Sequence, residues 1–419
     1  MNIKRRLRYF TGIFVMACAV LFSTAAVAQV AGCPDPLATN YNPLVTVNDG
    51  SCTYSVTSRT PVVKVNPLSD TLIETSGLQM AANYLWSFND GGGSAAIYRI
   101  DTISNALLQR VYLQGATNVD WEDIAFDGLN FYVGDFGNNA NGARTDLKIY
   151  KFPLSAIPDF NVSPVVTITS DKIEVINFTY SNQPQPPVPT TNNNTKFDCE
   201  AMIIDGGKIH LFTKNWINLN TTHYEINSLV AGTFIAQPIE TLATNYLVTA
   251  ADKSYGQKII ALLGYQATGF GNHYLTLLTD YTSNTYFSGN KRQINLPNAL
   301  IMGQAEGICF RNGTYGYISN ERVTSFSISQ KLFSFYIGDL VSNAAPSYTF
   351  TGNGNWDVPA NWRNNIAPPV SLASGSEIII DPSAGGICIL NIPYTIPTGT
   401  RLIINSAKAF IVQASLTIN

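Results

Sequence analysis

Three segments of the chain carry a glutamate in the same local pattern. They read Asp120-Trp-Glu122-Asp-Ile, Asp198-Cys-Glu200-Ala-Met and Gln304-Ala-Glu306-Gly-Ile. Each segment runs through a few apolar residues into an Asp-Gly or Asn-Gly hairpin signal, and a second apolar strand follows. A unit of strands and tight turns repeated at long spacing is typical of a radial β-repeat. We therefore expect Glu122, Glu200 and Glu306 to occupy equivalent positions that face a common axis.

Two further repeat openings carry an acid near the same place, in Glu74-Thr-Ser-Gly77 and Thr249-Ala-Ala-Asp252. Like carboxylates brought close together cannot all stay ionised without compensation, so a cation, raised pKa values or paired Lys and Arg must balance them. Oxygen-rich coordination favours Ca²⁺. The predicted metal site consists of Glu74, Glu122, Glu200, Asp252 and Glu306, of which Glu122, Glu200 and Glu306 are also the predicted catalytic acids and bases. Two alternatives stay open: the acids bind backbone N–H groups of a neighbouring repeat, or they line a ligand pocket without chemistry.

Four more residues are candidates for substrate binding. Asp135, Asn138 and Arg144 follow the second strand of their repeat, where we expect a loop. Arg144 is predicted as an anion clamp or as the salt-bridge partner of Asp135. Lys214 is predicted either to meet a phosphate or to neutralise the acidic ring. The chain has no Gly-x-Ser-x-Gly elbow, no His-Glu-x-x-His and no P-loop, so a hydrolase of this sequence would depend on carboxylates and a metal.

The elements that position these residues are predicted to be strands. Aromatic residues make up 11 % of the chain and helical periodicity is almost absent, which favours an all-β protein. The five openings between residues 59 and 342 predict a five-bladed β-propeller. Six blades are the alternative if the long interval that holds the Asn/Pro-rich stretch 182–194 hides a further one. The strand 61–65 precedes the first opening, and we expect it to complete the last blade after residues 331–338.

Several longer segments resemble secreted bacterial propellers related to the phytase-like esterase group. They are Leu72 to Asp90, Gly134 to Asn139 with Arg144, Ile149-Tyr150, Thr213 to Trp216, Val248 to Asp252 and Ser319 to Glu321. The resemblance implies a propeller over most of residues 60–340. It also directs the functional prediction towards hydrolysis of phosphate or carboxylic esters.

The N-terminus has the features of a secretory signal peptide over residues 1–28. A basic start is followed by an apolar stretch and by the small-x-small site Ala26-Val27-Ala28. Lipoprotein processing at Cys18 is the alternative. We find no second apolar run of membrane-spanning length. These features predict a protein that is exported and either soluble or attached to the cell surface.

Residues 29–58 are predicted to form a separate N-terminal segment. Within it, residues 32–54, which begin Gly32-Cys33-Pro-Asp35 and end Ser51-Cys52-Thr-Tyr54, resemble a short cysteine-bounded repeat of secreted proteins from a large group of Gram-negative bacteria and, more distantly, thrombospondin type 3 repeats. This resemblance implies a protein that is secreted or held at the outer surface of a Gram-negative bacterium. A segment this small cannot bury a core, so a Cys33–Cys52 disulfide is predicted to hold it. Its Asn and Asp residues either form turns or bind Ca²⁺, and a structural spacer is the prediction we favour. Sequence leaves the pairing of Cys199, Cys309 and Cys388 open.

Residues 343–419 change character. Short apolar runs separated by turns predict a small β-solenoid or a sandwich-like domain. Trp356 and Trp362 are candidates either for sugar stacking or for anchoring this stack. Charged residues are only 13 % of the chain and the net charge is −3, which excludes a basic nucleic-acid footprint. Two functions therefore stay open: a Ca²⁺-dependent hydrolase-like protein for small esters or phosphoesters, and a non-catalytic binding or adhesion protein for a surface glycan or protein.

Overall fold

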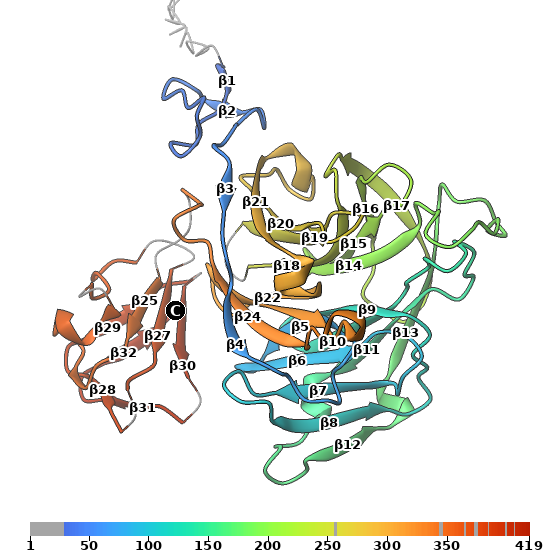
Figure 1. Ribbon diagram of the computed structural model, residues 1–419. Helices are drawn as coiled ribbons and strands as arrows, with labels where there is room; N and C mark the ends of the chain where they lie inside the picture. The colour runs from blue at the N-terminus through green and yellow to red at the C-terminus, as the bar shows by residue number, and fades with distance from the viewer. Residues whose placement is uncertain are drawn as a thin grey trace, which may run out of the picture.

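The computed structural model describes residues 29–254, 258–342, 347–363, 366–372, 376–383, 385–398, 400–405 and 407–419. The predicted signal peptide, including Cys18, lies outside the described residues. The described chain is nearly all β (Figure 1). Its helices are the short α1 (Ala299–Met302) and 3-10 turns at Leu154–Ala156, Ser170–Lys172, Tyr286–Ser288, Thr324–Phe326 and Pro359–Asn361. None of the helices in the described part of the chain combines the length and apolar character that crossing a bilayer requires.

The described residues between 62 and 336 form five antiparallel meanders of four strands each. Their first strands are β5 (Thr75–Ala81), β9 (Trp121–Phe126), β14 (Asp198–Asp205), β18 (Leu247–Lys253) and β22 (Gln304–Phe310). Each first strand lies beside the first strand of the next meander, and β22 lies beside β5, so the five first strands form a closed ring.

The later strands of each meander run outward from this ring. They are β6 (Tyr84–Asn89), β7 (Ala96–Ile100) and β8 (Leu107–Leu113); β10 (Asn130–Asp135), β11 (Lys148–Pro153) and β13 (Glu174–Tyr180); β15 (Lys208–Lys214), β16 (Thr221–Ile226) and β17 (Gly232–Leu242); β19 (Ile259–Tyr265), β20 (Asn272–Thr279) and β21 (Asn290–Asn298); and β23 (Tyr315–Glu321) with β24 (Lys331–Tyr336).

The fourth strand of the last meander comes from the start of the chain. Strand β4 (Val62–Val65) pairs antiparallel with β24, which confirms that the strand predicted at 61–65 completes the last unit. The two ends of the meander series are thereby joined by hydrogen bonds between backbones.

Three outermost strands of the meanders also pair with one further strand each, in parallel. Strand β17 pairs with β13, β12 (Val165–Ile168) pairs with β8, and β3 (Thr57–Ser58) pairs with β21. Residues 181–197, which include the Asn/Pro-rich stretch, contain no strand. The extra length between the second and third openings therefore consists of β12 and a loop, and the described residues there add no further meander.

The core is divided among the interfaces between neighbouring meanders. Each adjacent pair shares one cluster of buried apolar side chains, and one such cluster joins the last meander to the first. Between the first two meanders, Trp86 meets Phe131 and Phe88 meets Trp121 edge to face, at centroid distances of 5.2 and 5.5 Å. Because burial of large apolar surface is the main stabilising term, these interfaces hold the sheets around the axis.

The C-terminal region forms separate parallel sheets beside the ring (Figure 1). Their strand orders are β25–β27–β30 (Ser347–Phe350, Glu377–Ile380, Arg401–Ile404), β26–β28–β31 (Gly354–Asn355, Ile387–Leu390, Ala409–Val412) and β29–β32 (Tyr394–Ile396, Leu416–Ile418). Trp356 and Trp362 are 1 % and 2 % exposed in the core between these sheets. They anchor the stack and present no ring face for a sugar.

The N-terminal segment contains β1 (Ala31–Gly32) and β2 (Val47–Asn48), which pair in parallel. The predicted Cys33–Cys52 disulfide is present. Side-chain oxygens of Asp35, Asn48 and Asp49 each accept the backbone N–H two residues ahead, so these residues form turns. Asn40 Oδ1 instead accepts the Thr53 N–H and ties two parts of the segment together. Cys199, Cys309 and Cys388 are buried free thiols.

Candidate functional site

A β-bulge in each first strand sets the position of the acidic ring. The partner strand leaves one extra residue unpaired at Glu122 in β9, at Glu200 in β14 and at Glu306 in β22. The same irregularity falls on Thr249 in β18 and between Thr75 and Leu78 in β5. A bulge re-aims the side chain of the extra residue, so the three predicted glutamates are structurally equivalent.

The other two bulges carry hydroxyl groups instead of acids. Ser76 Oγ donates to the carbonyl oxygen of Glu122 at 2.7 Å, and Thr249 Oγ1 donates to that of Ala305 at 3.0 Å. The five bulges of the ring therefore carry three carboxylates and two hydroxyl groups. The two hydroxyl groups tie neighbouring first strands together by hydrogen bonds.

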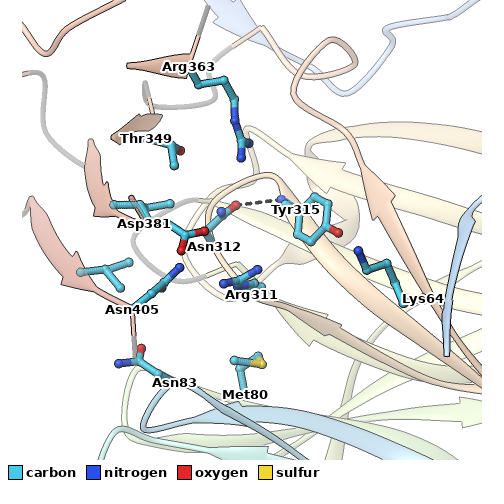
Figure 2. A pocket seen from close by; sticks show the side chains of 12 residues that line it. Lys64, Met80, Asn83, Arg311, Asn312, Tyr315, Thr349, Arg363, Asp381 and Asn405 are labelled. Carbon is cyan, nitrogen blue, oxygen red and sulfur yellow. Dashed lines mark hydrogen bonds between the residues drawn. The ribbon is translucent and has the colours of Figure 1, made fainter. Parts of the chain in front are cut away.

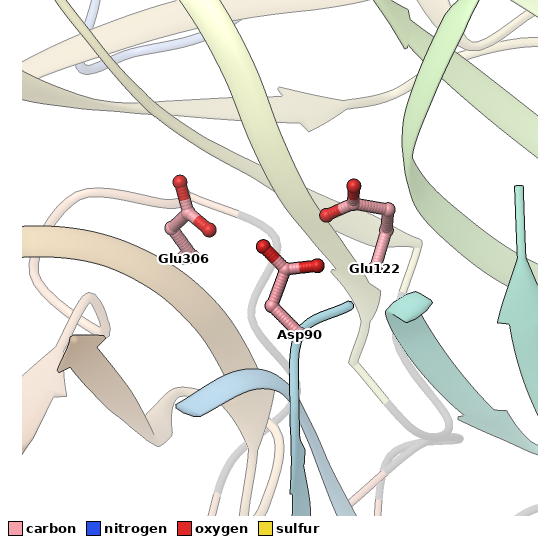
Figure 3. Close-up of side chains that lie close together, drawn as sticks. All are labelled: Asp90, Glu122 and Glu306. Carbon is pink, nitrogen blue, oxygen red and sulfur yellow. The ribbon is translucent and has the colours of Figure 1, made fainter. Parts of the chain in front are cut away.

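Glu122 and Glu306 meet a third carboxylate, that of Asp90, which follows β6. One carboxylate oxygen from each of Asp90, Glu122 and Glu306 lies within 4.8 Å of the others, and the three side chains point toward one another (Figure 3). Glu122 and Glu306 are each 2 % exposed. Burial, and then the charges of Glu200 and Asp90, raise the pKa of Glu122 well above its ordinary value.

Further carboxylates surround this trio. Burial is the largest cause of a raised pKa at Asp90 in the trio and at Asp120 and Glu321 beside it, and neighbouring carboxylates raise these pKa values further. The pKa reaches about 7 at Asp90 and about 6 at Asp120. Asp198 is also raised in pKa, although its oxygens accept the Asn138 N–H at 2.6 Å and Trp216 Nε1–H at 2.7 Å.

Lys214, the last residue of β15, is the buried cation of the cluster. Its Nζ lies 3.1 Å from Glu200 Oε1 and 3.8 Å from Glu306 Oε1. Burial alone would lower the pKa of this ammonium, but the Glu200 and Glu306 carboxylates outweigh it and raise the pKa well above its ordinary value. Gln304 Nε2 also donates to Glu306 Oε1, at 2.7 Å. Of the two roles predicted for Lys214, its position is therefore that of a cation that neutralises the acidic ring.

The negative charge of the Glu122 carboxylate is not compensated in the same way. Among the described residues, no donor forms a hydrogen bond to its carboxylate, although the side chain is almost fully buried. A buried carboxylate without a partner is unfavourable unless it binds a proton or a cation. The oxygen donor set of Asp90, Glu122 and Glu306 fits a hard divalent cation.

The loop after β10 supports the cluster from the side. Arg144 Nη2 lies 2.8 Å from Asp135 Oδ1, and its Nη1 donates to the Gly137 carbonyl at 2.8 Å. Asp135 Oδ1 also accepts the Asp120 N–H at 3.1 Å, and Asn138 Oδ1 accepts the Arg144 N–H at 3.0 Å. Arg144 is thus the salt-bridge partner of Asp135. Together with Asn138, these residues fix the backbone of Asp120 and the side-chain carboxylate of Asp198.

Two predicted ring members lie elsewhere. Glu74 is an exposed residue before β5, and its N–H donates to Asn89 Oδ1 at 3.2 Å. Asp252 lies three residues beyond the Thr249 bulge. Its Oδ2 accepts the Phe310 N–H at 2.6 Å and its Oδ1 accepts the Lys253 N–H at 2.8 Å. Asp252 therefore has the backbone-binding geometry that was the alternative prediction for these acids.

Sequence reasoning missed Asp90, Asp120, Asp198 and Glu321 as members of the cluster. Asp120 and Asp198 stand two residues before the glutamate of their own motif. Glu321 ends β23 opposite Gln304, just as Lys214 ends β15 opposite Asp198. Asp90 and Glu321 could have been predicted from their common position at the end of the second strand of a meander.

Comparison with known proteins shows likeness in fold only. No family model matches the chain, and no curated protein matches it. Among solved structures, an exo-β-1,3-galactanase from Phanerochaete chrysosporium is 10 % identical over 67 % of this chain and 65 % of its own, with a TM-score of 0.40. A GH43 β-1,3-galactosidase is 12 % identical over 66 % of this chain and 94 % of its own, with a TM-score of 0.37. A chain of the mitotic checkpoint complex is 14 % identical over 62 % of this chain and 63 % of its own, with a TM-score of 0.29.

The chain thus spans about two thirds of the length of the galactanase and of the checkpoint chain. The described residues define an all-β protein in which five four-stranded meanders close a ring through their first strands. Its particular features are the buried carboxylate cluster at one end of the ring and one disulfide near the N-terminus.

Proposed function

We propose that this protein is a five-bladed β-propeller followed by a small β-solenoid, and that it is secreted or held at the outer surface of a Gram-negative bacterium. The closed ring of five first strands supports the blade number. The stacked parallel strands of residues 347–418 support the solenoid. The features of residues 1–28 and the disulfide support export.

The channel end that holds the carboxylate cluster binds Ca²⁺ through Asp90, Glu122 and Glu306 in this proposal. The observation that carries it is the Glu122 carboxylate, which is buried, has no hydrogen-bond donor among the described residues and lies within 4.8 Å of the two other acids. Ca²⁺ is preferred over Mg²⁺ because it accepts irregular oxygen cages, whereas Mg²⁺ demands near-ideal octahedral geometry. Glu200 contributes charge nearby but is held by Lys214.

We assign to this site a hydrolase-like activity on phosphate or carboxylic esters. When bound, Ca²⁺ would supply Lewis-acid polarisation of an ester or phosphoryl oxygen. Asp120 is a partly exposed acid of the cluster and not one of the three proposed Ca²⁺ ligands, and its pKa of about 6 suits proton exchange near neutral pH. Asp135, Asn138 and Arg144 act as positioning residues for Asp120 and Asp198.

A non-catalytic binding or adhesion protein is the second candidate, and one observation favours it. Glu122, Glu200 and Glu306 are each only 2 % exposed, so a substrate reaches them only through the partly exposed layer of Asp90, Asp120 and Glu321. In this case the cation would hold the blades together at the channel end without reaction.

Calorimetric titration of the mature chain with Ca²⁺ tests the cation site. We expect binding by the wild type and loss of that binding in Glu122→Gln, which keeps the side-chain shape and removes the charge. Glu174→Gln, an exposed acid paired with Lys151, is the matched control and should bind as the wild type does. Equal binding by wild type and Glu122→Gln would refute the site.

Hydrolysis of p-nitrophenyl phosphate and p-nitrophenyl acetate, with Ca²⁺ and with EDTA, then separates the two candidate functions. Ca²⁺-dependent turnover that Glu122→Gln abolishes supports the hydrolase. Ca²⁺ binding and a raised melting temperature without turnover of either ester support the binding protein.

A further inference from the structure

A cleft lies between the ring and the C-terminal sheets, away from the carboxylate cluster. It consists of two adjoining cavities of about 250 and 420 Å³, which share the residues Lys64, Asn83, Arg311, Tyr315, Asp381 and Asn405. We call it the C-terminal cleft. The hairpin turns that follow β5 and β22 form one wall, and strands β25, β27 and β30 with the residues after them form the other (Figure 2).

The cleft carries an excess of positive charge. Lys64, Arg311, Arg363 and Lys408 line it together with only two carboxylates, those of Asp101 and Asp381. Asp381 lies 3.2 Å from Lys408 and so is already paired. Among the residues that the structure describes, no carboxylate lies within ion-pair distance of Lys64, Arg311 or Arg363. Three of the four cations, from two parts of the fold, therefore line one cleft without forming an ion pair with a described residue.

Neutral polar groups fill the wall between these cations. Asn312 Oδ1 already accepts the Tyr315 N–H at 2.9 Å, which leaves its amide N–H₂ available to donate into the cleft. Asn83 and Asn405 add two more side-chain amides, each able to donate and to accept. Tyr315 presents an aromatic ring at the junction of the two cavities.

The two walls are fixed relative to each other by one buried acid. Glu377 Oε2 accepts the Gly313 N–H at 2.9 Å, and Glu377 Oε1 lies 3.0 Å from Arg401 Nη1. Glu377 is 1 % exposed. Because Gly313 belongs to the same turn as Arg311 and Asn312, this contact sets the width of the cleft at its charged wall.

We propose that the C-terminal cleft binds an acidic oligosaccharide, with Lys64, Arg311 and Arg363 receiving its carboxylate or sulfate groups. The two cavities, of about 250 and 420 Å³, are larger than one small anion needs, and side-chain amides that can bind sugar hydroxyls line them together with the cations. The Tyr315 side chain, which lines both cavities, supplies an aromatic group for contact with a pyranose ring. Guanidinium groups bind carboxylates and sulfates through two parallel hydrogen bonds.

The test is calorimetric titration of the mature chain with hexasaccharides at low ionic strength in EDTA. The probes are an oligogalacturonate, a sulfated heparin-type hexasaccharide and the neutral maltohexaose. We expect at least one acidic probe to bind and maltohexaose not to bind. The carboxylated and sulfated probes distinguish the two sources of negative charge. Raising the salt concentration should weaken binding because the contacts are solvent-exposed charges.

Variants locate the binding. Lys64→Gln, Arg311→Gln and Arg363→Gln should each weaken the affinity by about three- to tenfold, in keeping with partly exposed ion pairs. The triple variant should abolish measurable binding. Lys172→Gln, an exposed lysine on a 3-10 turn outside the cleft, is the matched control and should bind normally. Glu122→Gln should also bind normally, so the result is independent of the proposed Ca²⁺ site.

Three outcomes would overturn the proposal. They are equal affinity for maltohexaose and the acidic probes, unchanged affinity in the triple variant, and equally tight binding of inorganic sulfate alone. A hexa-aspartate peptide that binds as tightly as the oligosaccharides, with the same loss in the triple variant, would instead assign the cleft to acidic peptides.

Discussion

Replacement of Lys214 by methionine is the most direct test of how the carboxylate cluster is held. The Lys214 ammonium lies 3.1 Å from Glu200 Oε1 and 3.8 Å from Glu306 Oε1, and its side chain is 4 % exposed. At an effective dielectric constant of 20, a pair of charges at these distances attracts by about 4–5 kcal/mol. Methionine keeps an unbranched stem against the rings of Trp216 and Tyr265, which the ammonium now faces at 5.0 and 5.2 Å.

Lys214→Met should lower the free energy of unfolding by about 3–5 kcal/mol at pH 8, because it leaves buried carboxylates without a counter-charge. The loss should shrink as the pH falls. Burial and neighbouring charges raise the pKa of Asp90 to about 7 and of Asp120 to about 6, so the folded state binds protons there more readily than the unfolded chain does. Stability is therefore lost as the pH rises through these values, and protonation at lower pH replaces the missing cation.

Urea unfolding in EDTA at pH 8 and pH 5.5 measures both effects. The double variant Lys214→Met/Glu200→Gln removes one charge of each sign and should recover part of the loss at pH 8. A loss below about 1 kcal/mol at pH 8, with the same deficit at pH 5.5, would refute the view that Lys214 neutralises this cluster.

Two further predictions concern single side chains. A Cβ on Gly137 would overlap Glu122 Oε1 and Asp120 Oδ2, so Gly137→Ala should weaken Ca²⁺ binding in calorimetry by about tenfold or more. The control is Gly93→Ala, whose Cβ meets no atom closer than 4.0 Å and should leave the affinity unchanged. Equal affinities of the two variants would contradict the assigned position of Glu122. Burial and the neighbouring His223 lower the pKa of His210 to about 4, so the folded protein keeps this ring neutral while the unfolded chain protonates it near pH 6.5. The resulting stability, about 3 kcal/mol, is present above pH 6.5 and lost as the pH falls towards 4. His210→Phe should remove that dependence in urea unfolding, and parallel stability curves for variant and wild type between pH 7 and 4 would contradict it.

The meanders and the partner of the N-terminal strand were predictable from local sequence. An Asp-Gly or Asn-Gly turn after a short apolar run specifies a hairpin by itself, and three copies of the same run specify equivalent hairpins. An unpaired strand before the first repeat has a natural place at the edge of the last repeat, where β4 indeed pairs with β24. These predictions depend on interactions between residues close in sequence or on the closure of a repeat.

The membership of the acidic cluster depends on the bulges, which sequence does not mark. Without a bulge, Asp252 is a plausible counterpart of Glu200, but the extra residue of β18 is Thr249, three positions earlier. Asp90 and Glu321 come from the ends of second strands and join the cluster only because the hairpins align. Their contribution is set by tertiary geometry between strands far apart in the chain.

The pairing of β4 with β24 has a consequence for the order of events during synthesis. Val62 and Ser334, which pair across this edge, are 272 residues apart. At ribosomal rates of about 5–20 residues per second, β4 waits roughly 15–50 s before its partner has been made. Through that interval it is an open strand edge, which is the kind of surface that attracts other chains. The ring therefore closes last, once β24 is available to pair with β4.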